Sequence, residues 1–155
     1  MLMYRVDTKR VLIVDDEPTI LLSLSHLLSN RLVSVITTGN IEEAEETIST
    51  HKIDLVLADI RLSGVHGYEG LRLLNYVKEK SPEARVIIMT AYSTPEMKEA
   101  AYEKGAYHYY EKPVDINDLL EKVAACGIPV SEPRRMKRNH SALARQNALQ
   151  GKFQF

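Results

Sequence analysis

The stretch Val11-Leu12-Ile13-Val14-Asp15-Asp16-Glu17 joins four consecutive apolar residues to three consecutive acids. A short apolar run without polar alternation is typical of a strand that is buried on both faces of a parallel sheet. Carboxylates that directly follow such a strand lie at its carboxyl end, which is where doubly wound α/β sheets build their sites. This stretch therefore predicts the fold class and the place of the site together.

Further strands and helices alternate after this first strand. Apolar runs predict strands over residues 33–36, 53–58, 86–89 and 106–110. Helical spacing of apolar residues predicts helices over residues 18–28, 41–48, 68–80, 95–104 and 115–125. Asp115 is the expected N-cap of the last helix, and Gly105 and Gly127 are expected to end the last two. Strict alternation predicts an α/β fold with a doubly wound five-stranded parallel sheet and five helices on its two faces.

Polar residues with a common chemistry follow four of the expected strands. Asp15 and Asp16 follow the first, Asp59 the third, Thr90 the fourth and Lys112 the fifth. Carboxylates held together repel one another unless a cation joins them, and Mg²⁺ prefers such oxygen ligands. A carboxylate is also a nucleophile in aspartyl-phosphate chemistry, with a metal ion, an ammonium and a hydroxyl neutralising the phosphoryl oxygens.

Each of these residues also has an ordinary structural interpretation. Asp15 and Asp16 are typical N-cap residues before a helix, and Asp59 and Thr90 are typical turn residues. Lys112 before Pro113 is an ordinary surface lysine at the start of a helix. All of these interpretations would have to hold at once at the same edge of the sheet, so we favour the phosphoryl site.

The same residues resemble the receiver domain of bacterial two-component response regulators. Residues 11–17 look like that family's opening strand and acidic pair, and residues 59–67 look like its phosphoacceptor loop. Thr90-Ala91 looks like its switch hydroxyl and small neighbour. Lys112-Pro113 looks like its invariant lysine and proline, whose peptide bond is often cis. The resemblance covers roughly residues 7–126 and implies the flavodoxin-like receiver fold.

The resemblance implies a role for each site residue. Asp59 is expected to accept the phosphoryl group. Asp16 and Asp59 are expected to bind Mg²⁺ directly with the backbone carbonyl of Arg61, and Asp15 mainly through a coordinated water. Lys112 and Thr90 are expected to contact the phosphoryl group.

Tyr109 matches the switch aromatic residue of this family, which swings inward when the threonine at the place of Thr90 moves toward the phosphoryl group. Ser63 and His66 depart from the proline and aspartate that are common at these places in the acceptor loop, but neither position carries the chemistry.

The expected function is a signalling switch rather than an enzyme acting on other substrates. A histidine kinase or phosphotransfer protein would phosphorylate Asp59, and the face of the fourth helix, fifth strand and fifth helix would change for homodimerisation or partner binding. A phosphatase with an aspartate nucleophile usually carries a second aspartate two residues later, where Arg61 stands here. A binding module without phosphorylation would be expected to lack an acid or Lys112, and both are present.

Composition sets the remaining expectations. The chain has 155 residues, of which 45% are hydrophobic, and a single cysteine, Cys126. No apolar run reaches the roughly 18 residues of a membrane span, so we expect a cytoplasmic protein.

The net charge differs between two parts of the chain: residues 1–130 carry a net charge of −6 and residues 131–155 of +5. We therefore predict a receiver domain over 7–126. Residues 127–155 are expected to be a basic, partly disordered linker or tail of a single-domain regulator, or the stub of the output region of a truncated DNA-binding regulator, with nucleic acid as a partner only if a longer output domain exists.

Overall fold

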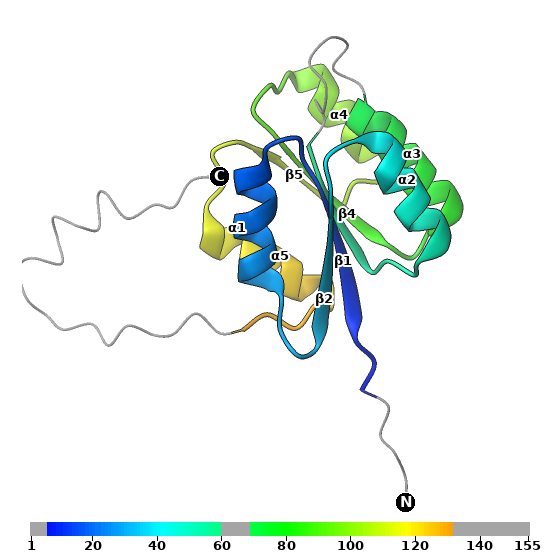
Figure 1. Ribbon diagram of the computed structural model, residues 1–155. Coiled ribbons are helices and arrows are strands. Elements are labelled where there is room, and N and C mark those ends of the chain that lie inside the picture. The colour runs from blue at the N-terminus through cyan, green and yellow to red at the C-terminus, as the bar shows by residue number, and fades with distance from the viewer. Residues whose placement is uncertain (1–5, 60–68, 132–155) are drawn as a thin grey trace, which may run out of the picture.

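The computed structural model of the protein describes residues 6–59 and 69–131 (Figure 1). In these residues strands and helices alternate along the chain. They are β1 (Lys9–Val14), α1 (Pro18–Leu28), β2 (Val33–Thr38), α2 (Ile41–Thr50), β3 (Leu55–Ala58), α3 (Glu69–Lys80), β4 (Arg85–Thr90), α4 (Pro95–Glu103), β5 (His108–Glu111) and α5 (Ile116–Ala125).

The five strands form one parallel sheet in the order β2-β1-β3-β4-β5. The chain therefore moves from β1 to one edge of the sheet and then returns to the other side of β1, which makes the gap between β1 and β3 the topological switch point. Val14 pairs with Ala58 across that gap. The next residues, Asp15 and Asp59, consequently leave the sheet side by side.

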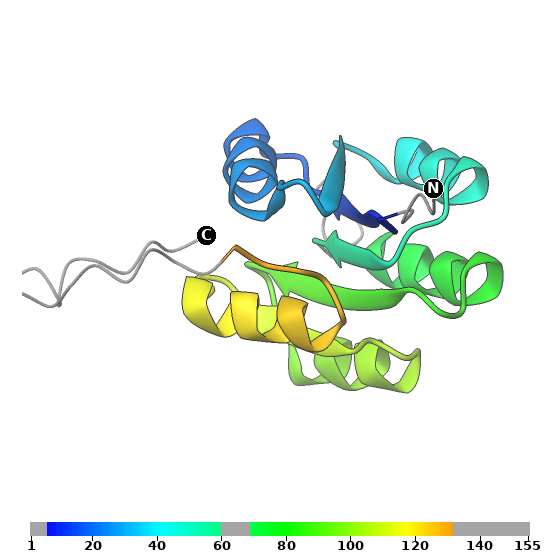
Figure 2. The ribbon, with the colours of Figure 1, turned by 90° about the horizontal axis from the view of Figure 1, so that it is seen from below.

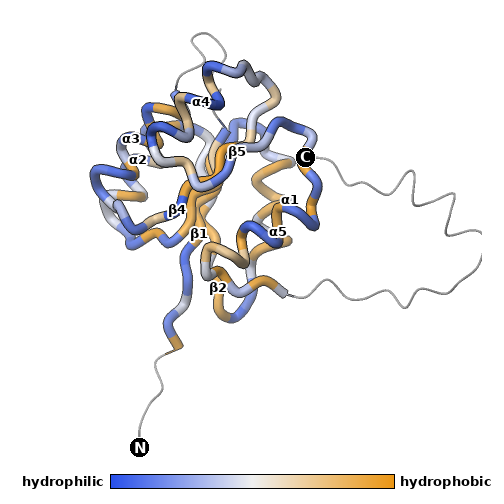
Figure 3. Tube along the Cα trace, turned by 180° about the vertical axis from the view of Figure 1, so that it is seen from behind, coloured by the Kyte–Doolittle hydropathy of each residue, from blue (hydrophilic) through white to orange (hydrophobic). Residues whose placement is uncertain are grey.

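The helices cover both faces of the sheet, as Figure 1 and Figure 2 show: α1 and α5 lie on one face, and α2, α3 and α4 on the other. Successive residues of β1 alternate between the two cores. Leu12 and Val14 pack with residues of α2 and α3, whereas Val11 and Ile13 pack with residues of α1 and α5. Both faces of the central strands are therefore apolar, and the tube in Figure 3 is coloured hydrophobic along β1 and β4. Burying each such side chain contributes about 1.5–3 kcal/mol.

Local signals fix the ends of the helices. The side chains of Asn40, Thr94 and Asp115 accept hydrogen bonds from backbone N–H groups in the first turns of α2, α4 and α5. Gly105 (φ 95°) and Gly127 (φ 81°) lie just beyond α4 and α5 in the left-handed region that favours glycine. The predicted cap at Asp115 and both predicted breakers are thus confirmed.

The predicted fold is confirmed, with shifts at the ends of single elements. β3 begins at Leu55 rather than at residue 53, because the Asp54 carboxylate turns toward the neighbouring strand and accepts a hydrogen bond from Arg10 N. β2 continues to Thr38, since its last residue still pairs with Val14. None of the helices in the described part of the chain combines the length and apolar character that a bilayer crossing needs.

Candidate functional site

Three buried charged side chains meet at the carboxyl edge of the sheet. The Lys112 ammonium donates hydrogen bonds to Asp15 Oδ2 at 2.9 Å and to Asp59 Oδ2 at 3.1 Å. The side chains of Lys112, Asp15 and Asp59 are only 8%, 1% and 10% exposed. The predicted convergence of the first, third and fifth strand ends is therefore present in the structure.

The backbone holds this arrangement in place. Asp15 N donates to Thr38 O, and Asp59 N donates to Val14 O, so both aspartates are extensions of the central ladders. Lys112 N donates to Thr90 O at 2.7 Å, which ties the lysine to the end of β4. The peptide bond between Lys112 and Pro113 is cis, as the family resemblance implies.

The charge of Lys112 is stabilised at this site. Burial alone would lower the pKa of its ammonium, but the hydrogen bonds and negative charges of Asp15 and Asp59 outweigh burial and raise it. Lys112 therefore stays protonated and provides a fixed positive charge beside the Asp59 carboxylate.

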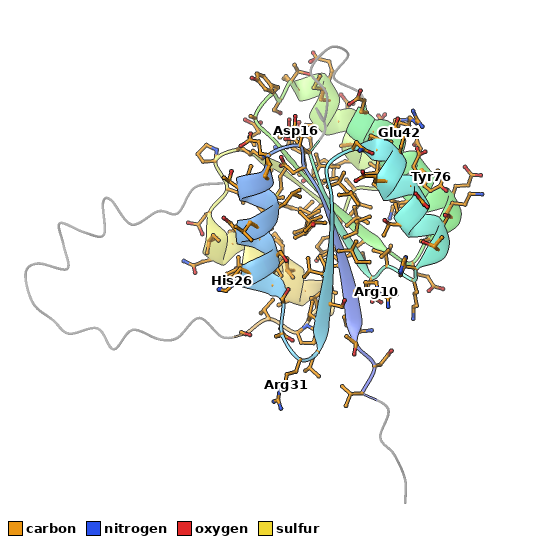
Figure 4. The ribbon with its side chains drawn as sticks, viewed as in Figure 1. Arg10, Asp16, His26, Arg31, Glu42 and Tyr76 are labelled. Carbon is orange, nitrogen blue, oxygen red and sulfur yellow. The ribbon has the colours of Figure 1, made fainter. Side chains whose placement is uncertain are left out.

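Two exposed carboxylates, those of Asp16 and Glu17, lie beside Asp15 on the solvent side of this site. Asp15, Asp16 and Glu17 each offer a carboxylate oxygen, and these oxygens lie within 4.8 Å of one another. Asp16 is exposed and lies just before the first turn of α1. Figure 4 shows it at the opposite end of this helix from Arg31. The partial burial of its carboxylate and the charges of Asp15 and Asp59 raise its pKa, against the opposing effect of Lys112.

This donor set fits a hard divalent cation, because it consists of oxygen ligands whose mutual repulsion such an ion relieves. Glu17 belongs to the cluster although the sequence argument did not assign it a ligand role. The backbone carbonyl of Arg61, another expected ligand, lies outside the described residues.

The acids before α1 are not side-chain N-caps of that helix. The N-cap position is Glu17, whose side chain makes no cap hydrogen bond, and Pro18 begins the helix. Asp15 Oδ1 instead accepts a hydrogen bond from Glu17 N at 2.9 Å. Its other oxygen remains directed at Lys112.

Thr90 is fully buried at the end of β4. Its hydroxyl accepts a hydrogen bond from Tyr92 N at 3.1 Å and lies 3.4 Å from Tyr92 O. The hydroxyl is thus held by the loop that leads into α4. Because β3 and β4 are parallel, the end of β4 lies at the same edge of the sheet as Asp59.

Tyr109 is held at both ends. It is 4% exposed, its hydroxyl donates to Ser93 Oγ at 2.8 Å, and its backbone N–H donates to the Tyr102 hydroxyl at 3.2 Å. Ser93 in turn donates to Glu111 Oε1 at 3.3 Å. Burial raises the pKa of the Tyr109 phenol, against the opposing effect of its bond to Ser93. The predicted switch aromatic therefore points inward here.

Sequence reasoning missed the partners of Tyr109. Ser93 follows Thr90 by three residues in a loop, and Tyr102 lies on the exposed side of α4. Neither has a motif or a periodicity that marks it. Their roles depend on where the fold places β5 relative to α4, which local patterns do not reveal.

Comparison with known proteins agrees with this geometry. Residues 11–124 match the family model described as "Response regulator receiver domain". The chain is 33% identical over 132 residues to the DNA-binding transcriptional regulator NtrC of Escherichia coli K12, covering 83% of this chain and 28% of that protein. It therefore spans little more than a quarter of that relative's length.

Two further likenesses cover nearly the full length of the other chain. Sporulation initiation phosphotransferase F of Bacillus subtilis is 31% identical over 115 residues, which are 74% of this chain and 90% of that protein. The solved beryllofluoride-activated NtrC4 receiver domain dimer has a TM-score of 0.69 and 30% identity, covering 77% of this chain and 96% of that one. The chain therefore belongs to the family of response regulator receiver domains, the signalling domains of two-component systems.

Proposed function

We propose that Asp59 accepts a phosphoryl group from a sensor histidine kinase or a phosphotransfer protein. The observation that carries the proposal is the bridge that Lys112 makes between Asp15 and Asp59. An Asp59 carboxylate oxygen forms the bond to phosphorus, the bond from phosphorus to the donor's imidazole nitrogen breaks, and that imidazole takes up a proton. The buried Lys112 ammonium lies beside the place where negative charge gathers on the phosphoryl oxygens.

Mg²⁺ is the proposed cofactor. Asp16 and Asp59 would hold it directly with the backbone carbonyl of Arg61, and Asp15 through a coordinated water. The carboxylate cluster of Asp15, Asp16 and Glu17 supports this assignment, because it supplies the oxygen ligands that Mg²⁺ prefers. When bound, the ion neutralises the charge shared by the carboxylates and the phosphoryl group.

Thr90 and Tyr109 are the proposed switch pair. To donate a hydrogen bond to a phosphoryl group on Asp59, the Thr90 hydroxyl has to give up the 3.4 Å hydrogen bond that it donates to Tyr92 O. Tyr109 adjoins the same loop through Ser93. Movement of this loop would therefore change the face formed by α4, β5 and α5.

The proposed output is a protein contact rather than turnover of another substrate; the only reactions of the chain would be its own phosphorylation and dephosphorylation. One proposed partner is a second copy of the chain, which would bind through the α4-β5-α5 face to form a homodimer. The solved NtrC4 receiver domain is also a dimer. The alternative is a longer DNA-binding regulator, which the relative named NtrC exemplifies. We place the protein in the cytoplasm, where phosphodonor kinases act. A receiver over 7–126 and a basic tail over 127–155 remain predictions.

Phosphorylation by acetyl phosphate tests the central proposal. Intact mass is measured with and without Mg²⁺ for the wild type, Asp59→Asn and Asp54→Asn. Asp54 is the matched control because its carboxylate accepts a hydrogen bond from Arg10 N at the opposite edge of the sheet. We expect a Mg²⁺-dependent gain of one phosphoryl group in the wild type and in Asp54→Asn, and none in Asp59→Asn.

Two outcomes would contradict the proposal. Equal labelling of Asp59→Asn would place the phosphoryl group on another residue. A folded wild type that gains no mass with Mg²⁺ would favour a binding module that works without phosphorylation.

A further inference from the structure

The chain reverses direction where α5 ends. Cys126 N donates to the carbonyls of Lys122 and Val123, and Ile128 N donates to Val123 O at 3.4 Å. Gly127, with φ 81°, makes the reversal between them. This left-handed residue stops the helix, so the following segment cannot continue as an extension of α5. It runs back over the body of the domain instead.

The returning segment packs on the core between α1 and α5. Ile128 is 2% exposed and belongs to the same apolar cluster as Leu28 of α1, Val33 of β2 and Val123 of α5. Val130 is half-buried against this cluster. Residues beyond the end of the last helix therefore contribute to the fold.

Asn30, in the turn between α1 and β2, holds the segment by a polar contact. Its Nδ2 donates to Pro129 O at 2.9 Å, across a separation of 99 residues. Its Oδ1 accepts a hydrogen bond from Leu32 N at 2.8 Å, and its backbone exchanges two bonds of 3.2 Å with Val33. The same side chain thus shapes the turn and binds the returning chain.

Two contacts hold the returning segment, residues 128–131, on the body of the domain. A groove of about 360 Å³ lies between residues 30–32 of the turn and residues 129–131 of the segment. Ile128 fixes the segment on the core side, and Asn30 bridges to Pro129 beside the groove. Loss of the Asn30 bond would therefore free residues 129–131 while Ile128 keeps its place.

We propose that the α1–β2 turn is a docking surface for the chain's own residues 128–131, with Asn30 as its clamp. The folded body then extends past residue 126. Residues 129–131, at the orange end of the coloured ribbon in Figure 1, lie beside the α1–β2 turn. This turn precedes β2, so it lies at the amino edge of the parallel sheet, opposite Asp15 and Asp59.

The clamp is independent of phosphoryl transfer, so its test uses none. Solvent paramagnetic relaxation of methyl groups is measured by NMR on the full chain for the wild type, Asn30→Asp and Asn40→Asp. Asn30→Asp keeps the oxygen that Leu32 N needs, removes the donor to Pro129 O, and places a carboxylate against that carbonyl. Asn40→Asp adds the same charge while preserving the cap acceptor for Glu43 N.

Two other valines give the scale for Val130. Val123 is fully buried and Val6 is 61% exposed. In the wild type we expect the Val130 methyls to fall between them. In Asn30→Asp the Val130 relaxation should rise at least twofold toward that of Val6, with Val123 unchanged. Asn40→Asp should leave all three valines as in the wild type.

A wild-type Val130 as accessible as Val6 would overturn the docking surface. An unchanged Val130 in Asn30→Asp would overturn the role of Asn30. If Asn30→Asp unfolds, which a rise at Val123 reveals, Asn30→Ser replaces it, because serine still provides a turn acceptor but is too short to reach Pro129. The same rise at Val130 is then expected, and its absence overturns the clamp.

Discussion

The Tyr109 hydroxyl donates a 2.8 Å hydrogen bond to Ser93 Oγ and so joins β5 to the loop that follows β4. Ser93 passes the contact on by donating to Glu111 Oε1 at 3.3 Å. Glu111 pairs with Thr90 across β4 and β5. The two residues proposed as the switch are therefore connected through Ser93 and Glu111, neither of which belongs to a motif.

This relationship predicts unequal costs for removing the two hydroxyl groups. Ser93→Ala leaves the buried Tyr109 hydroxyl without its acceptor, so it should destabilise the fold by about 1–3 kcal/mol. Tyr109→Phe leaves Ser93 its bond to Glu111 and should cost only about 1 kcal/mol. Because the residues share one bond, the double variant should be less destabilised than the sum. Urea unfolding measures all three, and simple additivity would show that the bond contributes nothing.

The Lys112 bridge predicts a large effect of removing its charge. Lys112→Met leaves the buried carboxylates of Asp15 and Asp59 without this ammonium, and we expect a loss of about 3–5 kcal/mol in the presence of a chelator. Adding Mg²⁺ should restore part of that loss, since a cation between the carboxylates relieves their repulsion. Lys52→Met, at an exposed position, is the control for loss of one positive charge. A loss no greater than that of the control would mean that the bridge does not stabilise the fold.

His108 predicts a specific dependence of stability on pH. Burial lowers its pKa from the ordinary value of 6.5, and Lys122 and Lys98 lower it further against the opposing charge of Asp118. Below this value the unfolded chain binds the proton more readily than the folded chain, so stability falls as the pH falls through 6.5.

Replacing His108 by glutamine removes the titrating group and so this part of the dependence of stability on pH. Between about pH 7.5 and about pH 5.5, His108→Gln should lose less stability than the wild type does. His26→Gln on the exposed side of α1 is the matched control and should follow the wild type. Parallel stability curves for His108→Gln and the wild type would exclude a depressed pKa at His108.

The buried place of Ile128 predicts a core-like cost for a residue that follows the last helix. Ile128→Ala should destabilise the protein by about 2–5 kcal/mol, the range for removing a large aliphatic side chain from a packed interior. Val6→Ala, at a side chain that is 61% exposed, should change stability by less than about 0.5 kcal/mol. Thermal or urea unfolding of the full chain compares them. Equal, small effects would show that the returning segment adds nothing to the fold.

The sequence predicts the sheet and the acidic site for the same physical reason. Strands buried on both faces must be apolar throughout, so their ends are visible, and a parallel sheet brings all carboxyl ends to one edge. The sequence alone thus predicts that Asp15, Asp59 and Lys112 lie together. Arg61, whose carbonyl was also predicted to contribute, lies outside the described residues.

What the sequence did not reveal depends on contacts between distant parts of the chain. Asn30 and Pro129 are 99 residues apart, and Ser93 meets Tyr109 only after α4 and β5 have packed. The start of β3 was misplaced for a related reason, since Asp54 accepts its hydrogen bond from a residue of another strand. Such polar contacts have no periodicity, so each becomes visible only in the folded chain.

β5 is an edge strand in the order of the sheet, and the outer side of such a strand normally offers backbone groups to which a foreign strand can add. The Tyr102 hydroxyl from α4 already occupies the N–H of Tyr109 in the middle of β5. Adding a strand here would first require α4 to give up that bond. By holding this N–H, Tyr102 makes β5 a poorer template for an added strand than an uncovered edge strand would be.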